Sequence, residues 1–405
     1  MIWLLAGQLL VTAPAGAVQQ DSAMTITQAR ALARNASAAI VSARADADAT
    51  AARERQAGAY PNPLLSYGRE KTGSSAQDII AFDQPIELPG RRAARSEAAR
   101  LRRRAAEARL TFALSELDAE VSRRAATLIT GQTRVTITGG AAAHFARAAA
   151  SMRERLASGD VSGYAARRVA LEAARYAALS AEAESQRTTA RAGLAELTQT
   201  AVTMVVLPVL LPLSMSADSV AARIAHQHPL VQAAKIEAEA AAADSRFARQ
   251  LVFGTPVLSG GLKTERSSAD GNRATGFVAG FTLPLPLWDR RSGAIAATDA
   301  EARRLAADAE HLQRQITREA LALYEAVHRI DTQLETLKTA LGTEAQAALR
   351  AAEAAYSEGE ITLLEWLDAV RAYQEAESAY ATVLGDAITQ RALLERILGL
   401  RLIGH

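Results

Sequence analysis

Hydrophobic and polar residues follow two different periods along this chain, which predicts helices and strands in separate stretches. Two tracts, residues 90–207 and 287–405, are dominated by Ala, Leu, Arg and Glu, the strongest helix formers. All 11 prolines, which break helix interiors, lie outside these two tracts. Each tract exceeds 110 residues and is too long for one helix, so we expect long helical rods joined by turns.

Glycine-containing segments mark where the rods are expected to turn. In the first tract, "GQTRVTITGG", which ends at Gly140, and "LASGDVSG", around Gly159, predict two interruptions. In the second tract, "YSEGEIT", around Gly359, predicts one. A helix of about 45 residues between such breaks spans roughly 65 to 70 Å, far longer than a helix of a compact domain.

Two stretches with turn residues at their centres, about 61–88 and about 255–286, each predict a β-hairpin. Alternation is clearest in the last strand, where Phe277, Ala279 and Phe281 share one face. Aromatic residues are scarce overall and gather in or beside these hairpins, as expected where strands meet a bilayer. A small soluble sheet that caps a helical body would use the same residues, so both interpretations stay open.

Matching phrases occur twice, which indicates an internal duplication. "FDQPIELPGRR" begins at Phe82 and "FTLPLPLWDRR" begins at Phe281, 199 positions later. The stretches around the last two predicted glycine turns match at an offset of 200. The repeat predicts two structural halves, 18–206 and 218–405, joined by a linker at 207–217 in which two prolines prevent a helix.

The first 17 residues, "MIWLLAGQLLVTAPAGA", predict a signal peptide, because an apolar run precedes small residues at the spacing of a cleavage site. A buried first helix is the alternative. No later apolar run approaches the ~20 residues that a membrane-spanning helix needs. An open four-stranded sheet would leave edge groups unsatisfied in lipid, whereas three copies would supply the twelve strands of a closed barrel.

Composition argues against an enzyme and against a nucleic-acid-binding protein. The net charge is only +2, and the chain has no cysteine. It contains no Walker A loop, nucleophile elbow or H-E-x-x-H motif. His226 and His228 precede a predicted helix without a second cluster, so capping or surface roles are expected rather than a metal site. We therefore expect no catalytic residues, no cofactor and no resident metal.

Four stretches occur in this order along the chain: "YPNPLLSYG", "FDQPIELPGRRAARSEAA", "FTLPLPLWDRRSGAIAAT" and "AYSEGEITLLEWLDAVRAYQEAESAY". Together they resemble the TolC-type outer-membrane efflux protein family, in the branch that serves heavy-metal and other resistance-nodulation-division pumps. The resemblance implies a mainly α fold with a small β part. In it, a homotrimer forms a twelve-stranded β-barrel in the bacterial outer membrane and an α-helical tunnel in the periplasm. It also implies a periplasmic adaptor protein, an inner-membrane transporter and outer-membrane lipid as partners, and no nucleic acid.

The resemblance assigns roles to two groups of residues. The tips that would dock the adaptor are Arg155, Leu156, Ser158, Gly159 and Asp160 in the first half and Glu358, Gly359, Glu360 and Ile361 in the second. Glu365 and Asp368 fall where the family places acidic residues at the narrow end of the tunnel. Three copies would attract cations and raise some of these carboxylate pKa values through repulsion. Without the resemblance, the tips merely turn the chain and the acidic pair marks a solvated helix face.

The implied function is the passage of heavy-metal cations or small toxic compounds from the pump to the outside. Two alternatives remain: a soluble periplasmic coiled-coil scaffold capped by the hairpins, and the outer-membrane conduit of a type I protein secretion system. Solubility of the mature protein without detergent would favour the scaffold. Transport assays would separate the two conduits.

Overall fold

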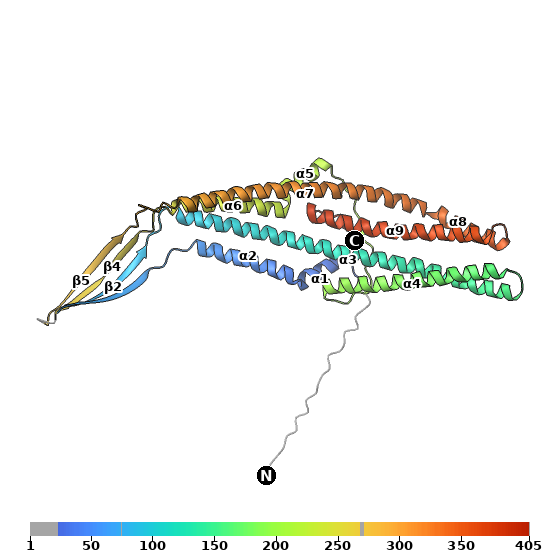
Figure 1. Cartoon of the computed structure of the whole chain (residues 1–405), viewed down its shortest axis with the longest axis horizontal. Helices are drawn as coiled ribbons and strands as arrows, with labels where there is room; N and C mark the ends of the chain where they lie inside the picture. Colours follow the sequence, from blue (N-terminus) through green and yellow to red (C-terminus); the bar gives the residue numbers. More distant parts are fainter. Residues whose placement is uncertain (1–22, 74, 268–270, 405) are drawn as a thin grey trace, which may run out of the picture.

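The computed structural model describes residues 23–73, 75–267 and 271–404 and shows one elongated molecule (Figure 1). A β-sheet forms one end, long helices run from it through the middle, and two helical hairpins form the other end. The predicted signal peptide, residues 1–17, lies outside the described residues. No helix in the described ranges is both long and apolar enough to cross a membrane.

One order of elements occurs twice along the chain. The first half contains α1 (Ile26–Ala36), α2 (Ala38–Ala57), β1 (Leu64–Thr72), β2 (Ser75–Pro85), α3 (Arg91–Ala157) and α4 (Gly163–Thr198). The second contains α5 (Ala217–Gln227), α6 (Pro229–Gln250), β4 (Val257–Ser267), β5 (Arg273–Thr282), α7 (Ser292–Ala340), α8 (Thr343–Glu358) and α9 (Leu363–Leu398). Between them, the short strand β3 (Val209–Leu210) pairs with β6 (Ile403–Gly404), which anchors this connecting segment beside α9.

The length of α3 corrects one expectation from the sequence. The predicted interruption near Gly140 is wrong, because α3 runs without a break for 67 residues. A glycine costs only about 1 kcal/mol in a helix interior, and α3 offsets this cost by packing against α2, α4, α6 and α9. The second half instead has a break that the sequence did not predict, where α7 ends at Ala340 and α8 begins at Thr343.

Small residues bring α3 close to its neighbours. At Gly385 of α9, an added Cβ would lie 2.1 Å from the hydroxyl oxygen of Thr130 on α3. At Gly131 of α3, an added Cβ would lie 3.2 Å from the Cα of Arg187 on α4. These adjacent crossings hold α4 and α9 against one segment of α3, beside a buried cluster that includes Val121, Leu128 and Ile388.

The short helices of the two halves share a capping arrangement. The Ser37 hydroxyl accepts a hydrogen bond from the Ile40 amide at the start of α2. Nδ1 of His228 accepts one from the Val231 amide at the start of α6, at 3.4 Å. The expected capping role of His228 is therefore confirmed. Burial, followed by the charge of Arg396, lowers the pKa of His228 from 6.5 to about 4.

Candidate functional sites at the sheet and the helical tips

One face of the four-stranded sheet is apolar. The strand order is β1-β2-β4-β5, and every neighbouring pair is antiparallel. The register aligns Leu65, Phe82, Gly260 and Ala279 in one row and Tyr67, Ile80, Leu262 and Phe277 in the next. The six large side chains in these rows are 53 % to 86 % exposed in the single chain. Together they present a continuous apolar surface that no described part of the chain covers.

The opposite face of the sheet carries mostly small and polar residues, and its larger apolar residues include Leu64, Ile79 and Val278. One of its rows contains Ser66, Ala81, Gly261 and Val278, and another contains Glu70, Gln77, Glu265 and Ala274. An added Cβ at Gly261 would lie 2.2 Å from the carbonyl oxygen of Ile80, so the β2–β4 pairing requires glycine there. The outer edges of β1 and β5 have no strand partner among the described residues. The sheet thus has two unlike faces and two open edges.

A buried arginine anchors the first copy of the repeated phrase between the sheet and the helices. Arg91 is 2 % exposed and begins α3. Its guanidinium donates hydrogen bonds to the carbonyl oxygens of Gln250 (3.0 Å) and Phe253 and to the hydroxyl of Thr255 (3.1 Å). In the second copy, Arg290 and Arg291 are exposed. The sequence presented the two arginine pairs as equivalent and gave no sign that one member was buried.

Both helical tips are built in the same way. Gly159, with φ of 85°, and Gly359, with φ of 80°, adopt the left-handed conformation that ends the preceding helix. The Asp160 amide donates to the carbonyl of Arg155, and the Glu360 amide donates to the carbonyl of Ala355, both at 2.8 Å. The predicted turns are confirmed at these two positions.

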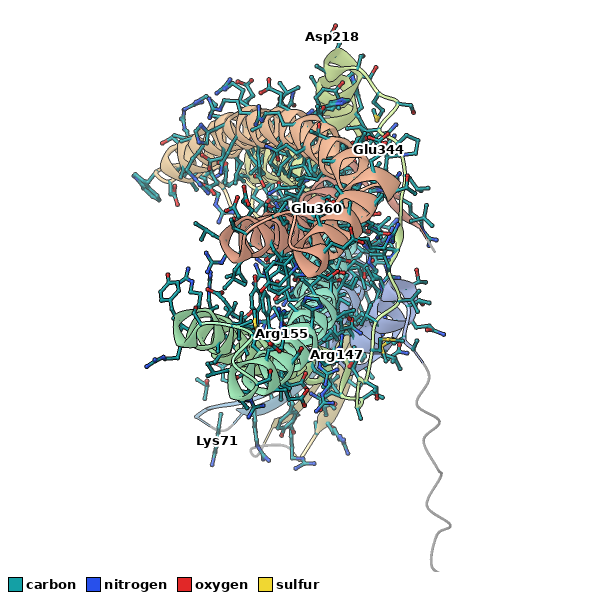
Figure 2. The ribbon with its side chains drawn as sticks, turned by 90° about the vertical axis from the view of Figure 1, so that its right-hand side faces the viewer. Lys71, Arg147, Arg155, Asp218, Glu344 and Glu360 are labelled. Atoms are coloured by element: carbon teal, nitrogen blue, oxygen red, sulfur yellow. The ribbon has the colours of Figure 1, made fainter. Side chains whose placement is uncertain are left out.

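The two tips lie at the same end of the molecule on separate hairpins. Figure 2 looks onto this end, with Arg155 of the first tip and Glu360 of the second labelled apart from each other. Among the nine predicted docking residues, Ile361 is partly buried and the others are exposed. Ile361 packs on an apolar cluster that also receives Val161 of the first tip. The tips are therefore separate surfaces with a shared apolar base.

Two exposed apolar side chains beside the tips were missed by the sequence reasoning. Tyr164 on α4 is 77 % exposed and Leu364 on α9 is 65 % exposed. They occupy equivalent positions, each five residues beyond the tip glycine. The sequence feature that could have identified them is an apolar residue in the first turn of each helix. At this position the neighbouring hairpin does not bury the side chain.

The predicted aperture residues lie on the exposed side of α9. Glu365 and Asp368 are both exposed, whereas Trp366 and Leu367 between them are buried. Oε2 of Glu365 accepts hydrogen bonds from the backbone amide (2.7 Å) and the hydroxyl (2.8 Å) of Thr362, which completes a capping box. These hydrogen bonds lower the pKa of Glu365 in the single chain. Glu365 therefore has a local role that the sequence reasoning did not foresee.

Aromatic rings join the two hairpins behind the tips. Phe145 of α3 stacks on Tyr176 of α4 with ring centroids 4.7 Å apart, and Trp366 of α9 stacks on Tyr356 of α8 at 5.0 Å. Phe145 and Trp366 connect the two stacks at 5.9 Å. The tips are thus held at one end of the molecule by contacts between hairpins as well as by the long helices.

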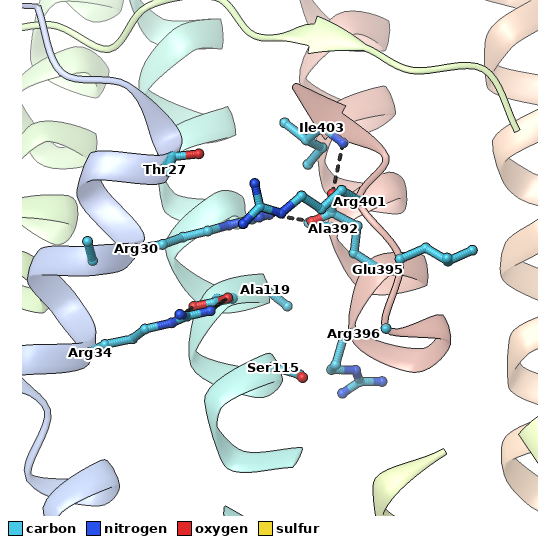
Figure 3. Close-up of a pocket in the computed structure, with 14 residues that line it drawn as sticks. Thr27, Arg30, Arg34, Ser115, Ala119, Ala392, Glu395, Arg396, Arg401 and Ile403 are labelled. Atoms are coloured by element: carbon cyan, nitrogen blue, oxygen red, sulfur yellow. Dashed lines mark hydrogen bonds and ion pairs between the residues drawn. The ribbon is translucent and has the colours of Figure 1, made fainter. Parts of the chain in front are cut away.

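A polar cavity of about 280 Å³ lies among α1, α3 and α9 in the middle of the molecule (Figure 3). Arg30 of α1 forms an ion pair with Glu395 of α9 and donates to the Ser122 hydroxyl of α3 at 2.9 Å. Glu395 also accepts from the Leu402 and Ile403 amides, at 2.6 and 2.8 Å. Arg30 and Glu395 are thus engaged with each other and with neighbouring groups of the chain. Their ion pair and hydrogen bonds join α1, α3 and α9 around the cavity. The described residues contain no cluster of three or more His, Asp or Glu suited to a metal.

Comparison with known proteins bears on the choice between an outer-membrane channel and a soluble scaffold. Residues 220–400 match the family model described as outer membrane efflux protein. Over 387 residues the chain is 28 % identical to the cobalt-zinc-cadmium resistance protein CzcC of Cupriavidus metallidurans, covering 93 % of this chain and 90 % of that protein. The chain is therefore similar to outer membrane efflux proteins over nearly its whole length. As expected from the sequence, it is a transport protein rather than an enzyme, and its place is the outer membrane.

Solved structures of membrane proteins, an outer membrane channel among them, share the fold of this chain. The CmeC outer membrane channel of Campylobacter jejuni matches with a TM-score of 0.75 at 14 % identity, over 92 % of this chain and 85 % of CmeC. A membrane protein from Pseudomonas aeruginosa matches with a TM-score of 0.77 at 20 % identity, over 92 % of this chain and 93 % of that one. The predicted mainly α fold with a small β part is confirmed.

Proposed function

We propose that three copies of this efflux protein form the outer-membrane channel of a tripartite efflux pump. The observation that carries the proposal is the sheet, with one apolar face, one small and polar face, and two open edges. In a closed barrel the apolar face meets lipid and the other face lines a water-filled lumen. The long helices then continue the conduit into the periplasm.

The two open edges support the proposed closure into a barrel. β1 has 9 residues and β5 has 10, so the edge of one copy matches the edge of the next in length. Pairing β1 of each copy with β5 of its neighbour is a head-to-tail contact, which closes into a ring. Three copies then give twelve strands, an even number as in other bacterial barrels.

We assign the substrate and the partners from the resemblance and from the relative. CzcC is named for cobalt, zinc and cadmium resistance, which favours heavy-metal cations as substrate. The tips, including Gly159 and Gly359, are proposed to dock a periplasmic adaptor, which connects to an inner-membrane transporter. Exposed Tyr164 and Leu364 extend these docking surfaces with apolar contacts.

Deletion of the protein tests this function. The deletion strain is expected to lose tolerance to one or more of zinc, cobalt, cadmium and copper, and to regain it when the wild-type chain is supplied. Sensitivity to hydrophobic drugs alone would retain the efflux role and overturn the metal substrate. Unchanged tolerance to every compound would overturn the efflux proposal.

A further inference from the structure

Three basic side chains lie in one row of the sheet, at the end away from the helices. The register aligns Lys71 with Ala76, Ala76 with Arg266, and Arg266 with Arg273. All three basic side chains are exposed, and Figure 2 shows Lys71 pointing away from the ribbon. Because side chains alternate along a strand, Lys71 lies on the same face as Tyr67. The row therefore belongs to the apolar face.

This row lacks a counter-charge within the part of the chain that the structure describes. Like charges directly opposite each other destabilise a sheet, and Arg266 and Arg273 are such a pair. No described residue forms an ion pair or hydrogen bond with the side chain of Lys71, Arg266 or Arg273. By contrast, Arg69, one row closer to the apolar rows, lies 3.7 Å from Asp78, from Nε to Oδ1.

In the two rows that contain Glu70 and Lys71, charge is sorted by face. Glu70 precedes Lys71 and Glu265 precedes Arg266, so both carboxylates point to the polar face. The two acidic residues share the next row, through Gln77 between them. Positive charge thus gathers on the face that also carries the exposed apolar rows.

We propose that Lys71, Arg266 and Arg273 bind the phosphate groups of anionic lipids around the barrel. The proposal rests on the proposed function, in which the apolar face meets the membrane. Arg273 precedes Phe277 by four residues, so it lies about 13 Å further along β5 toward the turn end of the sheet. This position places the basic row outside the apolar rows, at the depth of lipid headgroups. Guanidinium groups pair with phosphate through two parallel hydrogen bonds, and lysine adds a point charge.

Lipid retention tests the proposal. Wild type, a triple variant (Lys71→Gln, Arg266→Gln, Arg273→Gln) and a charge-preserving control (Arg266→Lys, Arg273→Lys) are reconstituted in phosphatidylcholine vesicles containing a minor fraction of phosphatidylglycerol. Polymer-bounded nanodiscs are then cut from the vesicles, and their ratio of the two lipids is compared with that of the bulk. Wild type and the control are expected to enrich phosphatidylglycerol. The triple variant should return to the bulk ratio, with relative affinity falling by about fivefold per charge removed.

The outcomes separate this proposal from the proposed function. Insertion is scored by flotation with vesicles after an alkaline wash. Failure of the wild type to insert would overturn the channel and the lipid site together. Insertion with equal enrichment in wild type and triple variant would overturn the lipid site alone. If only the triple variant fails to insert, the salt dependence of the wild type decides. Its enrichment of phosphatidylglycerol should decrease when salt is raised from about 0.1 M to 1 M, and enrichment independent of salt would overturn the proposal.

Discussion

Glu365 illustrates how one carboxylate combines a structural role with a proposed role in transport. Its Oε2 accepts two hydrogen bonds from Thr362 and so caps α9 at the second tip. It is exposed beside Asp368, three residues further on the same helix face. The cap lowers its pKa in the single chain, whereas repulsion in a ring of three copies would raise it. An alanine substitution would remove cap and charge together and could not separate these roles.

We expect Glu365→Gln combined with Asp368→Asn to reduce cation preference while α9 stays capped. Glutamine at the third helical position still completes a capping box, so the change removes charge alone. The measurement is the reversal potential of single channels in a salt gradient. Asp218→Asn, at an exposed carboxylate on α5 away from the tips, is the matched control for the loss of a charge. An unchanged reversal potential in the double variant would remove these residues from the aperture.

His228 predicts a pH dependence of stability. Its pKa is about 4 in the folded chain and 6.5 when unfolded, so between these values the unfolded state binds more protons. This stabilisation is fully present above pH 6.5 and is lost as the pH falls through 4. We expect the free energy of unfolding to fall by about 2 kcal/mol between about pH 7 and pH 5 from this residue.

The His228→Asn variant isolates the titration, because asparagine caps a helix without changing charge in this range. Thermal unfolding in detergent, followed by far-ultraviolet circular dichroism, is compared at the two pH values. The melting temperature of the variant should depend less on pH than that of the wild type. An equal dependence in both proteins would contradict the assignment.

At the scale of elements, two helical glycines that look alike in the sequence differ in what surrounds them. An added Cβ at Gly140 meets no atom within 4 Å, whereas at Gly385 it would lie 2.1 Å from Oγ1 of Thr130. We expect Gly385→Ala to destabilise the fold by about 1–3 kcal/mol. Gly140→Ala should stabilise it by about 0.5–1 kcal/mol, because it only improves helix propensity.

Thermal unfolding of the single and paired variants checks this prediction. Adding Thr130→Ala to Gly385→Ala should recover part of the lost stability, because it removes the atom that the new methyl group meets. Equal effects of alanine at Gly140 and at Gly385 would show that α3 and α9 do not approach as described.

The sequence was sufficient for elements whose signals are local. Turn residues located both hairpins, and the glycines at 159 and 359 marked both tips. The sequence was insufficient where the role of a residue depends on a partner far away in the chain. The role of Gly385 depends on Thr130, and the burial of Arg91 depends on carbonyl groups at the end of α6 and just beyond it. The basic row is visible only once the register aligns Lys71 with Arg266 and Arg273, which lie 195 and 202 positions later in the sequence.

At the scale of the whole molecule, the proposed channel requires three chains to pair the two sheet edges that one chain leaves open. In a single chain, β1 and β5 are opposite edges of a four-stranded sheet, separated by roughly 14 Å at about 4.8 Å per strand. A disulfide needs Cβ atoms about 3.5–4.5 Å apart, so no bond can join these edges within one chain. Because the chain has no cysteine, introduced pairs report only on contacts between copies.

The most direct measurement is disulfide formation across this edge in the outer membrane. One cysteine replaces Ser66 on the polar face of β1, and the second is placed in turn at Gly276, Val278 and Gly280 on the same face of β5. We predict that one combination converts the protein to a covalent species of three chains on non-reducing electrophoresis. If every combination stays monomeric under oxidising conditions, the three-copy barrel is contradicted.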